Sequence, residues 1–375
     1  MSRGQIIEKS KGVWLVRIES RANGRRKSVS KQVRGVKKDA QKFLTKWLRD
    51  IDTGIFVEPS VLTLNDYFNQ WLEAAVRPRV SPRTADGYAA LLSRYICKPI
   101  GDKKLENLQP LDIQKVYAEM QAKGLSARIV RHTHAALHNA LKQAVRWNLI
   151  NRNPAEIVEL PKLPHIERRV LTREEAVTFL ATADQMTHGL IFEFALLSGM
   201  RPEEYLALQW TDIDHERGTA QVVRALVRHK GSWSFEETKT ARSRRVVSLP
   251  KPLLDKLKAH KLRQAEQRLR AGATWQNNGL VFSSETGTPH SIPNLTYRYF
   301  RPILSKAGLP QIRLYDLRHS HATLLLLSEE NPKIVAERLG HSTVVLTLDT
   351  YSHVLPSMQQ QTTAKLTTML YEKAG

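Results

Sequence analysis

Four side chains in the second half of the chain have the chemistry needed to break and rejoin a phosphodiester. They are two arginines, a histidine and a tyrosine, namely Arg201, Arg318, His341 and Tyr351. A tyrosine hydroxyl can attack a phosphodiester and then hold the broken strand covalently. Two guanidinium groups can bind the non-bridging oxygens while negative charge builds on them. The four residues therefore predict phosphoryl transfer on a nucleic-acid backbone.

The charge balance of the chain favours a polyanionic partner. Among 375 residues, 58 are Lys or Arg and 36 are Asp or Glu, which gives a formal net charge of +22 and a pI near 10.1. Nucleic acid and an anionic membrane surface both match such a charge. The sequence has no apolar run of the ~20 residues that a bilayer span requires, so nucleic acid is preferred. Cys97 is the only cysteine, which excludes an intrachain disulfide and agrees with a reducing, cytoplasmic location.

Residues 1–57 are expected to form a separate basic domain. Residues 1–60 hold 15 Lys/Arg against 6 Asp/Glu, so +9 of the net charge lies there. Alternating apolar residues around Val16, the turn signal Asn23-Gly24 and a helical pattern after it predict a three-stranded sheet backed by one helix. The density of basic residues on the strands favours a nucleic-acid surface over a merely solvated hairpin. These residues are Arg21, Arg25, Arg26, Lys27, Lys31 and Arg34.

Residues 62–160 predict an all-helical domain. Four helices are expected. One starts at Leu64, a second opens with a cap at Ser81 and a first-turn proline at Pro82, a third opens at Pro110, and a fourth runs from about Ser126 to Trp147. Gly54–Pro59 is expected to be a linker before this domain. Asn151–Pro164 is expected to be an extended linker after it, because it contains three prolines.

Residues 166–375 predict a mixed α/β domain in which helices surround a short β region. A capping box at Thr172–Glu175 opens its first helix. Strand-like runs cover residues 219–228, 233–238 and 244–249. Lys239 lies between the last two runs, which places it at the tip of a hairpin. The fold class expected for the whole chain is therefore α+β, multidomain and mostly helical.

This last segment resembles the catalytic domain of the tyrosine recombinase, or phage integrase, family. Three sequence boxes in the right order make the resemblance specific, and Tyr351 follows His341 by ten positions. The boxes are Gly199–Glu204, Asp316–His319 with Ala322-Thr323 after it, and Leu339–Ser342 followed by Thr347 and Thr350–His353.

The resemblance implies a role for each catalytic residue. Tyr351 would be the nucleophile, and Arg201 and Arg318 would bind the scissile phosphate. His341 would hydrogen-bond the phosphate or take part in proton transfer. Lys239 would be the general acid that protonates the leaving 5′ oxygen, although a solvated basic turn is the alternative interpretation.

Three further residues are expected to support these groups. Glu204 could lie one helical turn from Arg201 and hold its guanidinium. His319 belongs to the second box and is expected to be structural. Tyr315 stands where many relatives have histidine, and a phenol cannot offer a cation near neutral pH. This departure leaves open which group accepts the proton of Tyr351.

No cofactor and no metal is expected. His134 and His138 have a spacing that zinc can use, but Ala135 stands where a zincin motif has glutamate, and no third ligand is evident. No Walker loop and no paired-carboxylate motif stands out. The resembled chemistry conserves the energy of the broken bond in a phosphotyrosine, so it implies neither ATP nor metal.

The sequence therefore predicts a site-specific integrase of a phage or another mobile element. The resemblance identifies residues 62–160 with a core-binding domain and residues 1–57 with an arm-type DNA-binding domain. The implied partners are double-stranded DNA with core-type and arm-type sites, three further copies in a homotetramer, an excisionase and a host DNA-bending protein. The alternatives are a Xer-like chromosomal or plasmid resolvase, a type IB topoisomerase, a DNA-binding regulator without catalysis and, more remotely, a membrane-surface protein.

Overall fold

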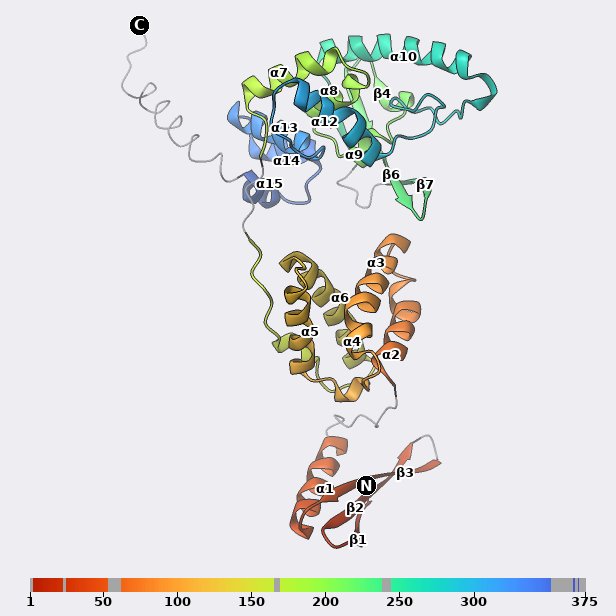
Figure 1. The fold of residues 1–375 in the computed structure, drawn as a ribbon, viewed down its shortest axis with the longest axis vertical. Coiled ribbons are helices and arrows are strands. Elements are labelled where there is room, and N and C mark those ends of the chain that lie inside the picture. The colour runs from red at the N-terminus through yellow and green to blue at the C-terminus, as the bar shows by residue number, and fades with distance from the viewer. Residues whose placement is uncertain are drawn as a thin grey trace. The chain divides into compact units, whose positions relative to one another are not determined.

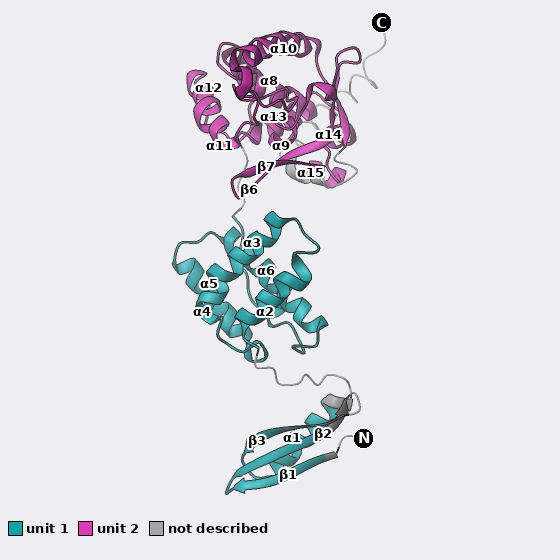
Figure 2. Ribbon diagram, turned by 90° about the vertical axis from the view of Figure 1, so that its right-hand side faces the viewer, with its two compact units in different colours: residues 1–165 teal, residues 166–375 magenta. Residues whose placement is uncertain are grey.

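The structure is a computed structural model of the full chain. It describes residues 3–22, 25–52, 62–164, 169–237, 244–351, 367 and 370. The chain divides into two compact units, residues 1–165 and residues 166–375, which are distinguished by colour in Figure 2.

Unit 1 begins with the predicted three-stranded sheet backed by one helix, seen at the N-terminal end in Figure 1. The strands are antiparallel in the order β1-β2-β3, and the apolar side chains of β2 pack against α1. Val16 and Ile18 are buried against Ala40, Leu44 and Trp47. The elements are β1 (Arg3–Ser10), β2 (Val13–Ala22), β3 (Arg25–Arg34) and α1 (Lys37–Asp52).

The second part of unit 1 contains the four predicted helices and one further, three-residue helix, α4, around an apolar core. Capping explains where two of them start: Thr63 forms a capping box with Asp66, and the Ser126 hydroxyl accepts from the backbone N–H of Ile129. The helices are α2 (Leu64–Trp71), α3 (Pro82–Leu92), α4 (Lys98–Ile100), α5 (Pro110–Ala122) and α6 (Ala127–Arg146). π-helical turns at Leu72–Val76 and Ser93–Cys97 extend α2 and α3.

The prediction that Asn151–Pro164 is an extended linker is wrong for the first part of this segment. Pro154–Ile157 forms a 3₁₀ turn, and Pro154 and Ala155 are buried against the helical core. The Asn153 side chain donates to the carbonyl of His138 at 3.2 Å and accepts from the N–H of Ala155 at 3.0 Å. Proline here opens a turn rather than extending the chain. The other expected linker, Gly54–Pro59, lies outside the described residues.

Unit 2 is mostly helical, with α8 at its centre. This helix is apolar on almost every side and is buried along most of its length, which is typical of a core helix. The helices are α7 (Arg173–Asp184), α8 (Gly189–Ser198), α9 (Pro202–Tyr205), α10 (Lys251–Ala271), α11 (Ile292–Leu295), α12 (Arg301–Lys306), α13 (Asp316–Leu327), α14 (Pro332–Leu339) and α15 (Val344–Tyr351). The strands are β4 (Ile213–Asp214), β5 (Thr219–Val222), β6 (Arg224–His229), β7 (Ser232–Glu237) and β8 (Arg245–Ser248).

The strands on either side of Lys239 pair with other strands. Strand β7 pairs with β6, whereas β8 pairs with β5, so β7 and β8 are not partners of each other. Strands β6 and β7 form a hairpin that turns at Lys230-Gly231. An alternating pattern identifies a strand but not its partner, so the sequence did not indicate these pairings. Lys239 and its expected place at a hairpin tip lie outside the described residues.

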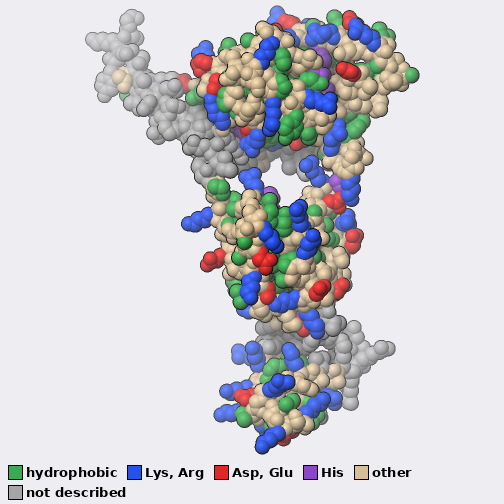
Figure 3. Space-filling model, in the orientation of Figure 1, with side chains coloured by type: hydrophobic (Ala, Val, Ile, Leu, Met, Phe, Trp, Pro, Cys, Tyr) green, Lys and Arg blue, Asp and Glu red, His purple; other side chains and the backbone are tan. Residues whose placement is uncertain are grey.

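Lys and Arg side chains are spread widely over the surface shown in Figure 3. Within the described parts of the chain, no helix combines the length and the apolar character that crossing a membrane would need.

Candidate active site

Arg318 connects two distant segments of unit 2. It lies in the first turn of α13, and its side chain is almost completely buried. Its Nη1 donates to the carbonyl of Gly199 at 2.8 Å, and its Nη2 donates to the carbonyl of Leu339 at 2.6 Å. The first predicted box therefore meets the third through the guanidinium of the second.

Two glycines shape the backbone around this guanidinium. Gly199 ends α8 and Gly340 ends α14, both in the left-handed conformation, with φ of +65° and +66°. Glycine adopts this conformation without a steric penalty, so it stops a helix and turns the chain sharply. A Cβ at Gly199 would also come within 2.4 Å of the His321 ring. The turns place Arg201 and His341 immediately after the ends of the two helices.

Arg201 is held by Glu204, as expected from the sequence. The Arg201 Nη1 donates to Oε1 of Glu204 at 2.8 Å, and the Arg201 backbone N–H donates to Oε2 at 2.8 Å. The Arg201 Nη2 approaches the carbonyl of Gly340 at 3.3 Å. Burial opposes the charge of Arg201, but Glu204 and Tyr315 raise the pKa of Arg201 above its usual value.

Arg245 also binds Glu204, and the sequence gave no role to this arginine. Its Nη1 and Nη2 donate to the two carboxylate oxygens of Glu204 at 3.1 and 2.8 Å. Burial would raise the pKa of Glu204, but the hydrogen bond and charge of Arg245, together with Arg201, lower it below its usual value. From the sequence, the run Ser243-Arg244-Arg245 can be recognised only as basic. Nothing in it indicates which arginine points inward.

The cluster carries more positive than negative charge. Among the described residues, Arg201, Arg245 and Arg318 surround one carboxylate, that of Glu204. Burial and then the charge of Arg201 lower the pKa of Arg318 to about 10, so this guanidinium stays charged at neutral pH. An anion with several acceptor oxygens, such as a phosphate, would balance the remaining charge.

His341 lies beside this cluster and is neutral near pH 7. Burial, followed by the charges of Arg318 and Arg201, lowers its pKa to about 4. Its Nδ1 lies 2.8 Å from the Oγ1 of Thr347, which is completely buried on α15. Thr347 precedes Tyr351 by four positions, so both residues lie on one face of α15.

The structure brings together Arg201, Arg318 and His341 of the five predicted catalytic residues. Tyr351 is the last residue of α15, but its side chain lies outside the described part of the structure. Lys239 lies wholly outside the described residues. Neither side chain is therefore placed relative to the cluster.

The two remaining supporting residues lie together at the start of α13. The ring of Tyr315 is 5.3 Å from that of His319, and His319 is buried while Tyr315 is partly exposed. Tyr315 raises the pKa of the neighbouring Arg201, as noted above. Tyr315 therefore lies next to the guanidinium of Arg201.

Arg338 is a second arginine that the sequence did not single out. It lies in the last turn of α14, and its Nε donates to Nε2 of His321 at 3.0 Å. Its Nη2 donates to the carbonyls of Leu197 and Ser248 at 3.1 and 2.9 Å. Arg338 thus fixes the end of α14, from which the chain turns at Gly340 toward His341.

The described residues include no group of three or more His, Cys, Asp or Glu side chains that could hold a metal ion. The Nδ1 of His134 lies 3.2 Å from the hydroxyl of Tyr117 inside the helical part of unit 1.

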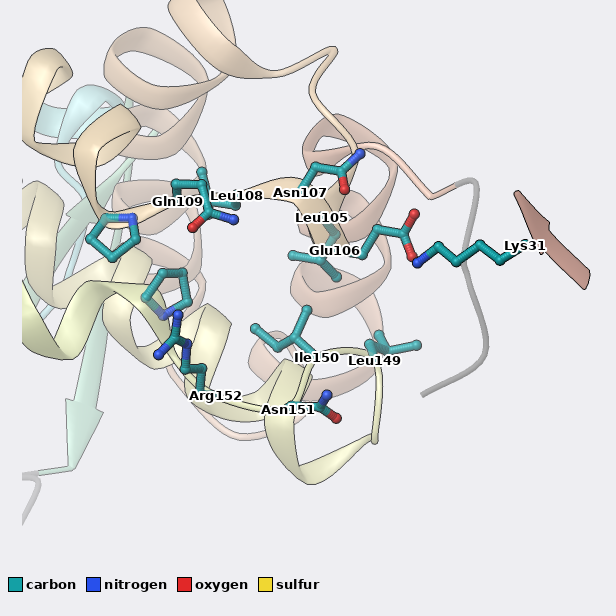
Figure 4. A pocket seen from close by; sticks show the side chains of 12 residues that line it. Lys31, Leu105, Glu106, Asn107, Leu108, Gln109, Leu149, Ile150, Asn151 and Arg152 are labelled. Atoms are coloured by element: carbon teal, nitrogen blue, oxygen red, sulfur yellow. The ribbon is translucent and has the colours of Figure 1, made fainter. Parts of the chain in front are cut away.

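Unit 1 also contains a cavity of about 340 Å³. It is lined by residues 105–110, 149–152 and Pro154, with Lys31 (Figure 4). None of the predicted catalytic residues lines this cavity.

Two parts of the chain match known family profiles. Residues 169–358 match the phage integrase family. Residues 63–121 match the N-terminal SAM-like domain of phage integrases. The first match includes every residue of the cluster described above.

Curated relatives are similar over most of their length. A XerC-like tyrosine recombinase of Caldanaerobacter subterraneus subsp. tengcongensis is 30% identical over 342 residues, which cover 86% of this chain and 87% of the relative. An integrase of Streptomyces ambofaciens is 30% identical over 325 residues, covering 84% and 82%. The ICEBs1 integrase of Bacillus subtilis is 28% identical over 283 residues, covering 75% and 76%.

Solved structures share the fold. The integrase of transposon Tn1549, in complex with a circular intermediate DNA, aligns with a TM-score of 0.67 at 19% identity, covering 80% of this chain and 99% of the other. A lambda integrase dimer bound to a core site aligns with a TM-score of 0.58 at 18% identity, covering 77% and 95%.

Proposed function

The chain belongs to the phage integrase family of tyrosine recombinases, and from this membership we propose that it is the integrase of a mobile element. As a tyrosine recombinase it is an enzyme that breaks and rejoins DNA strands. The observation that carries the proposal is the buried arginine cluster with His341, beside the helix that ends at Tyr351.

The proposed reaction consists of two transesterifications. The Tyr351 oxygen attacks the scissile phosphorus and forms a 3′-phosphotyrosyl bond, while the bond to the 5′ oxygen breaks. Lys239 gives a proton to that oxygen, which leaves as a 5′-hydroxyl. A 5′-hydroxyl from a partner duplex then attacks the phosphotyrosine, releases Tyr351 and reseals the strand. Two such rounds pass through a Holliday junction.

The residues of the cluster have different roles at the phosphate. Arg201 and Arg318 bind its non-bridging oxygens, where charge develops in the transition state. His341 is neutral, so the ring nitrogen that does not face Thr347 can hydrogen-bond the phosphate or accept the tyrosine proton. Glu204, Tyr315 and His319 keep these groups in place.

The N-terminal sheet supports the mobile-element assignment over a chromosomal resolvase. Residues 1–57 would bind arm-type DNA sites, residues 62–160 would bind one side of the core site, and residues 166–375 would cut it. Four copies on two duplexes would perform the exchange in the cytoplasm, with an excisionase and a host DNA-bending protein as helpers. A Xer-like resolvase is the second candidate, because one relative at 30% identity is XerC-like.

Incubation with two DNA duplexes tests the reaction. The full-length protein should form a covalent adduct with the 3′ end of a nicked duplex that carries the element's attachment site, in EDTA and without ATP. It should also produce strands exchanged between two labelled duplexes. Relaxation without exchange would indicate a type IB topoisomerase, and binding without an adduct would indicate a regulator.

A further inference from the structure

Arg245 is a buried arginine to which the reaction scheme above gives no role. It is the first residue of β8, and its side chain is only 7% exposed. Its Nη1 and Nη2 face Glu204, and its Nε donates to the carbonyl of Arg338 at 2.6 Å. These three contacts turn the guanidinium toward the protein, which indicates an indirect part in the reaction.

Glu204 is shared between Arg245 and Arg201. Its Oε1 accepts from Nη1 of both arginines, and its Oε2 accepts from Nη2 of Arg245 and from the backbone N–H of Arg201. The planar fork of Arg245 fixes the rotamer of this carboxylate, and the carboxylate in turn holds the Nη1 of Arg201. Without Arg245, Glu204 would remain buried with half of these donors.

The same guanidinium also supports the turn before His341. The carbonyl that accepts from Nε belongs to Arg338, two residues before Gly340. The Nη1 of Arg245 lies 3.0 Å from the position that a Cβ of Gly340 would occupy, so Arg245 packs directly against this turn. Arg245 therefore contacts both segments that deliver catalytic side chains to the cluster.

We propose that Arg245 is a positioning residue for strand cleavage, which orients Arg201 through Glu204 and supports the Gly340 turn. The proposal rests on the function proposed above for the same site. It assigns to Arg245 no contact with DNA. A misplacement of about 1 Å at a reacting phosphate can cost about 10²-fold in rate, so losing this support should be measurable.

The test compares single-turnover cleavage of a nicked suicide duplex by full-length variants. Arg245→Gln should slow cleavage by about 10- to 100-fold, whereas the Kd for the same duplex should change by less than about threefold. Arg245→Lys keeps the charge but loses the fork, so its rate should stay closer to that of Arg245→Gln than to the wild type. Each cleavage rate is divided by the fraction of the protein that binds DNA, which corrects for unfolded protein.

Lys256→Gln is the matched control for loss of stability. Lys256 binds the buried carboxylate of Glu193 at 2.9 Å in the same unit, away from the cluster. This variant also leaves a buried carboxylate without its cation, so it should lower the melting temperature. Its cleavage rate per folded molecule should remain that of the wild type. An equal slowing of cleavage in Lys256→Gln and Arg245→Gln would overturn the proposal.

A double-mutant cycle with Arg201→Ala isolates the route of the effect. If Arg245 acts through Arg201, Arg245→Gln should slow an Arg201→Ala protein by clearly less than it slows the wild type, and the remaining effect measures its support of the Gly340 turn. Full additivity of the two losses would reject this route, as would a wild-type rate for Arg245→Gln alone. Should Arg201→Ala itself cleave normally, the proposed active site would fail as well, which distinguishes the two failures.

Discussion

In the N-terminal sheet of unit 1 the side chains of Lys31 and Arg34 are exposed, whereas in unit 2 the guanidinium of Arg318 is almost completely buried between two backbone carbonyls. Exposed basic side chains are screened by salt and can adapt to many phosphate positions. A buried guanidinium bound by carbonyls has one position, and its charge acts in a medium of low polarity. The first arrangement suits affinity for DNA, and the second suits stabilisation of a transition state.

The largest expected effect comes from a substitution that removes catalysis and leaves DNA affinity intact. Tyr351→Phe removes one oxygen, the proposed nucleophile, and leaves the charges of both regions intact. Cleavage should be abolished while the Kd for the core site stays near that of the wild type. A denaturing gel of a suicide-substrate reaction measures the adduct. An undiminished yield of covalent adduct in the variant would refute the assignment of Tyr351.

Arg201→Ala and Arg318→Ala should each slow cleavage by on the order of 10²-fold or more, since they remove preorganised charge at the transition state. Binding should fall far less, because many other phosphates remain in contact. Gel-shift titrations and cleavage rates measured on the same DNA compare the two effects. Equal losses of binding and rate would mean that these arginines hold DNA in the way the N-terminal sheet is proposed to.

Arg318→Lys sharpens this prediction. Lysine keeps a positive charge but cannot reach the carbonyls of Gly199 and Leu339 with one planar fork. The variant should therefore cleave much more slowly than the wild type and also melt at a lower temperature. A rate close to that of the wild type would show that the charge alone is sufficient at this position.

The side-chain contact that the sequence predicted correctly is one that is encoded in local spacing. Arg201 and Glu204 are three positions apart and meet on one short helix, so the pattern predicted their contact. Arg245 and Arg338 meet their partners across 41 and 17 positions, through Glu204 and His321, and no local pattern contains such a contact. No local pattern indicates that β7 pairs with β6 and β8 with β5 either, because pairing between strands is a property of the whole sheet.

Deletion of residues 1–57 should remove the exposed basic side chains of the N-terminal sheet and leave the arginine cluster of unit 2 intact. The truncated protein should still bind and nick a core site, because no proposed catalytic residue lies in the deleted segment. It should lose affinity for a second class of sites beside the core, and with it efficient integration. Footprinting of both proteins on the element's end decides. Identical protection and equal recombination would favour the resolvase-like alternative.

Burial of the cluster also predicts how unit 2 responds to acid. His321 donates from Nδ1 to the carbonyl of Leu196 and accepts at Nε2 from Arg338, so only its neutral form fits. Burial and then the charge of Arg338 lower its pKa to about 3, and the pKa of His341 is about 4. The unfolded chain takes up these protons below about pH 6.5 and the folded chain does not, so stability falls as the pH drops from 6.5 toward 4.

Urea unfolding between pH 7.5 and 5 measures this effect. Each of the two histidines should contribute a slope of up to about 1.4 kcal/mol per pH unit to the free energy of unfolding. His321→Gln removes one of the two protons taken up on unfolding. It should therefore lower the slope of the unfolding free energy against pH by up to about 1.4 kcal/mol per pH unit, whatever its effect on stability at pH 7.5. A urea midpoint that stays constant over this range would contradict the neutral state of both rings.

The smallest expected effect concerns Thr347, which links His341 to the helix that carries Tyr351. Thr347→Val keeps the shape of the buried side chain and removes only the Oγ1 that lies 2.8 Å from Nδ1 of His341. The imidazole then loses the contact that orients it, so cleavage should slow by about 5- to 20-fold, in the range of about 1–2 kcal/mol for one hydrogen bond. DNA binding should not change, because Thr347 is completely buried. Thr347→Ser restores the hydroxyl and should recover most of the rate. If serine and valine slowed cleavage equally, packing of α15 rather than orientation of His341 would be the function of this residue.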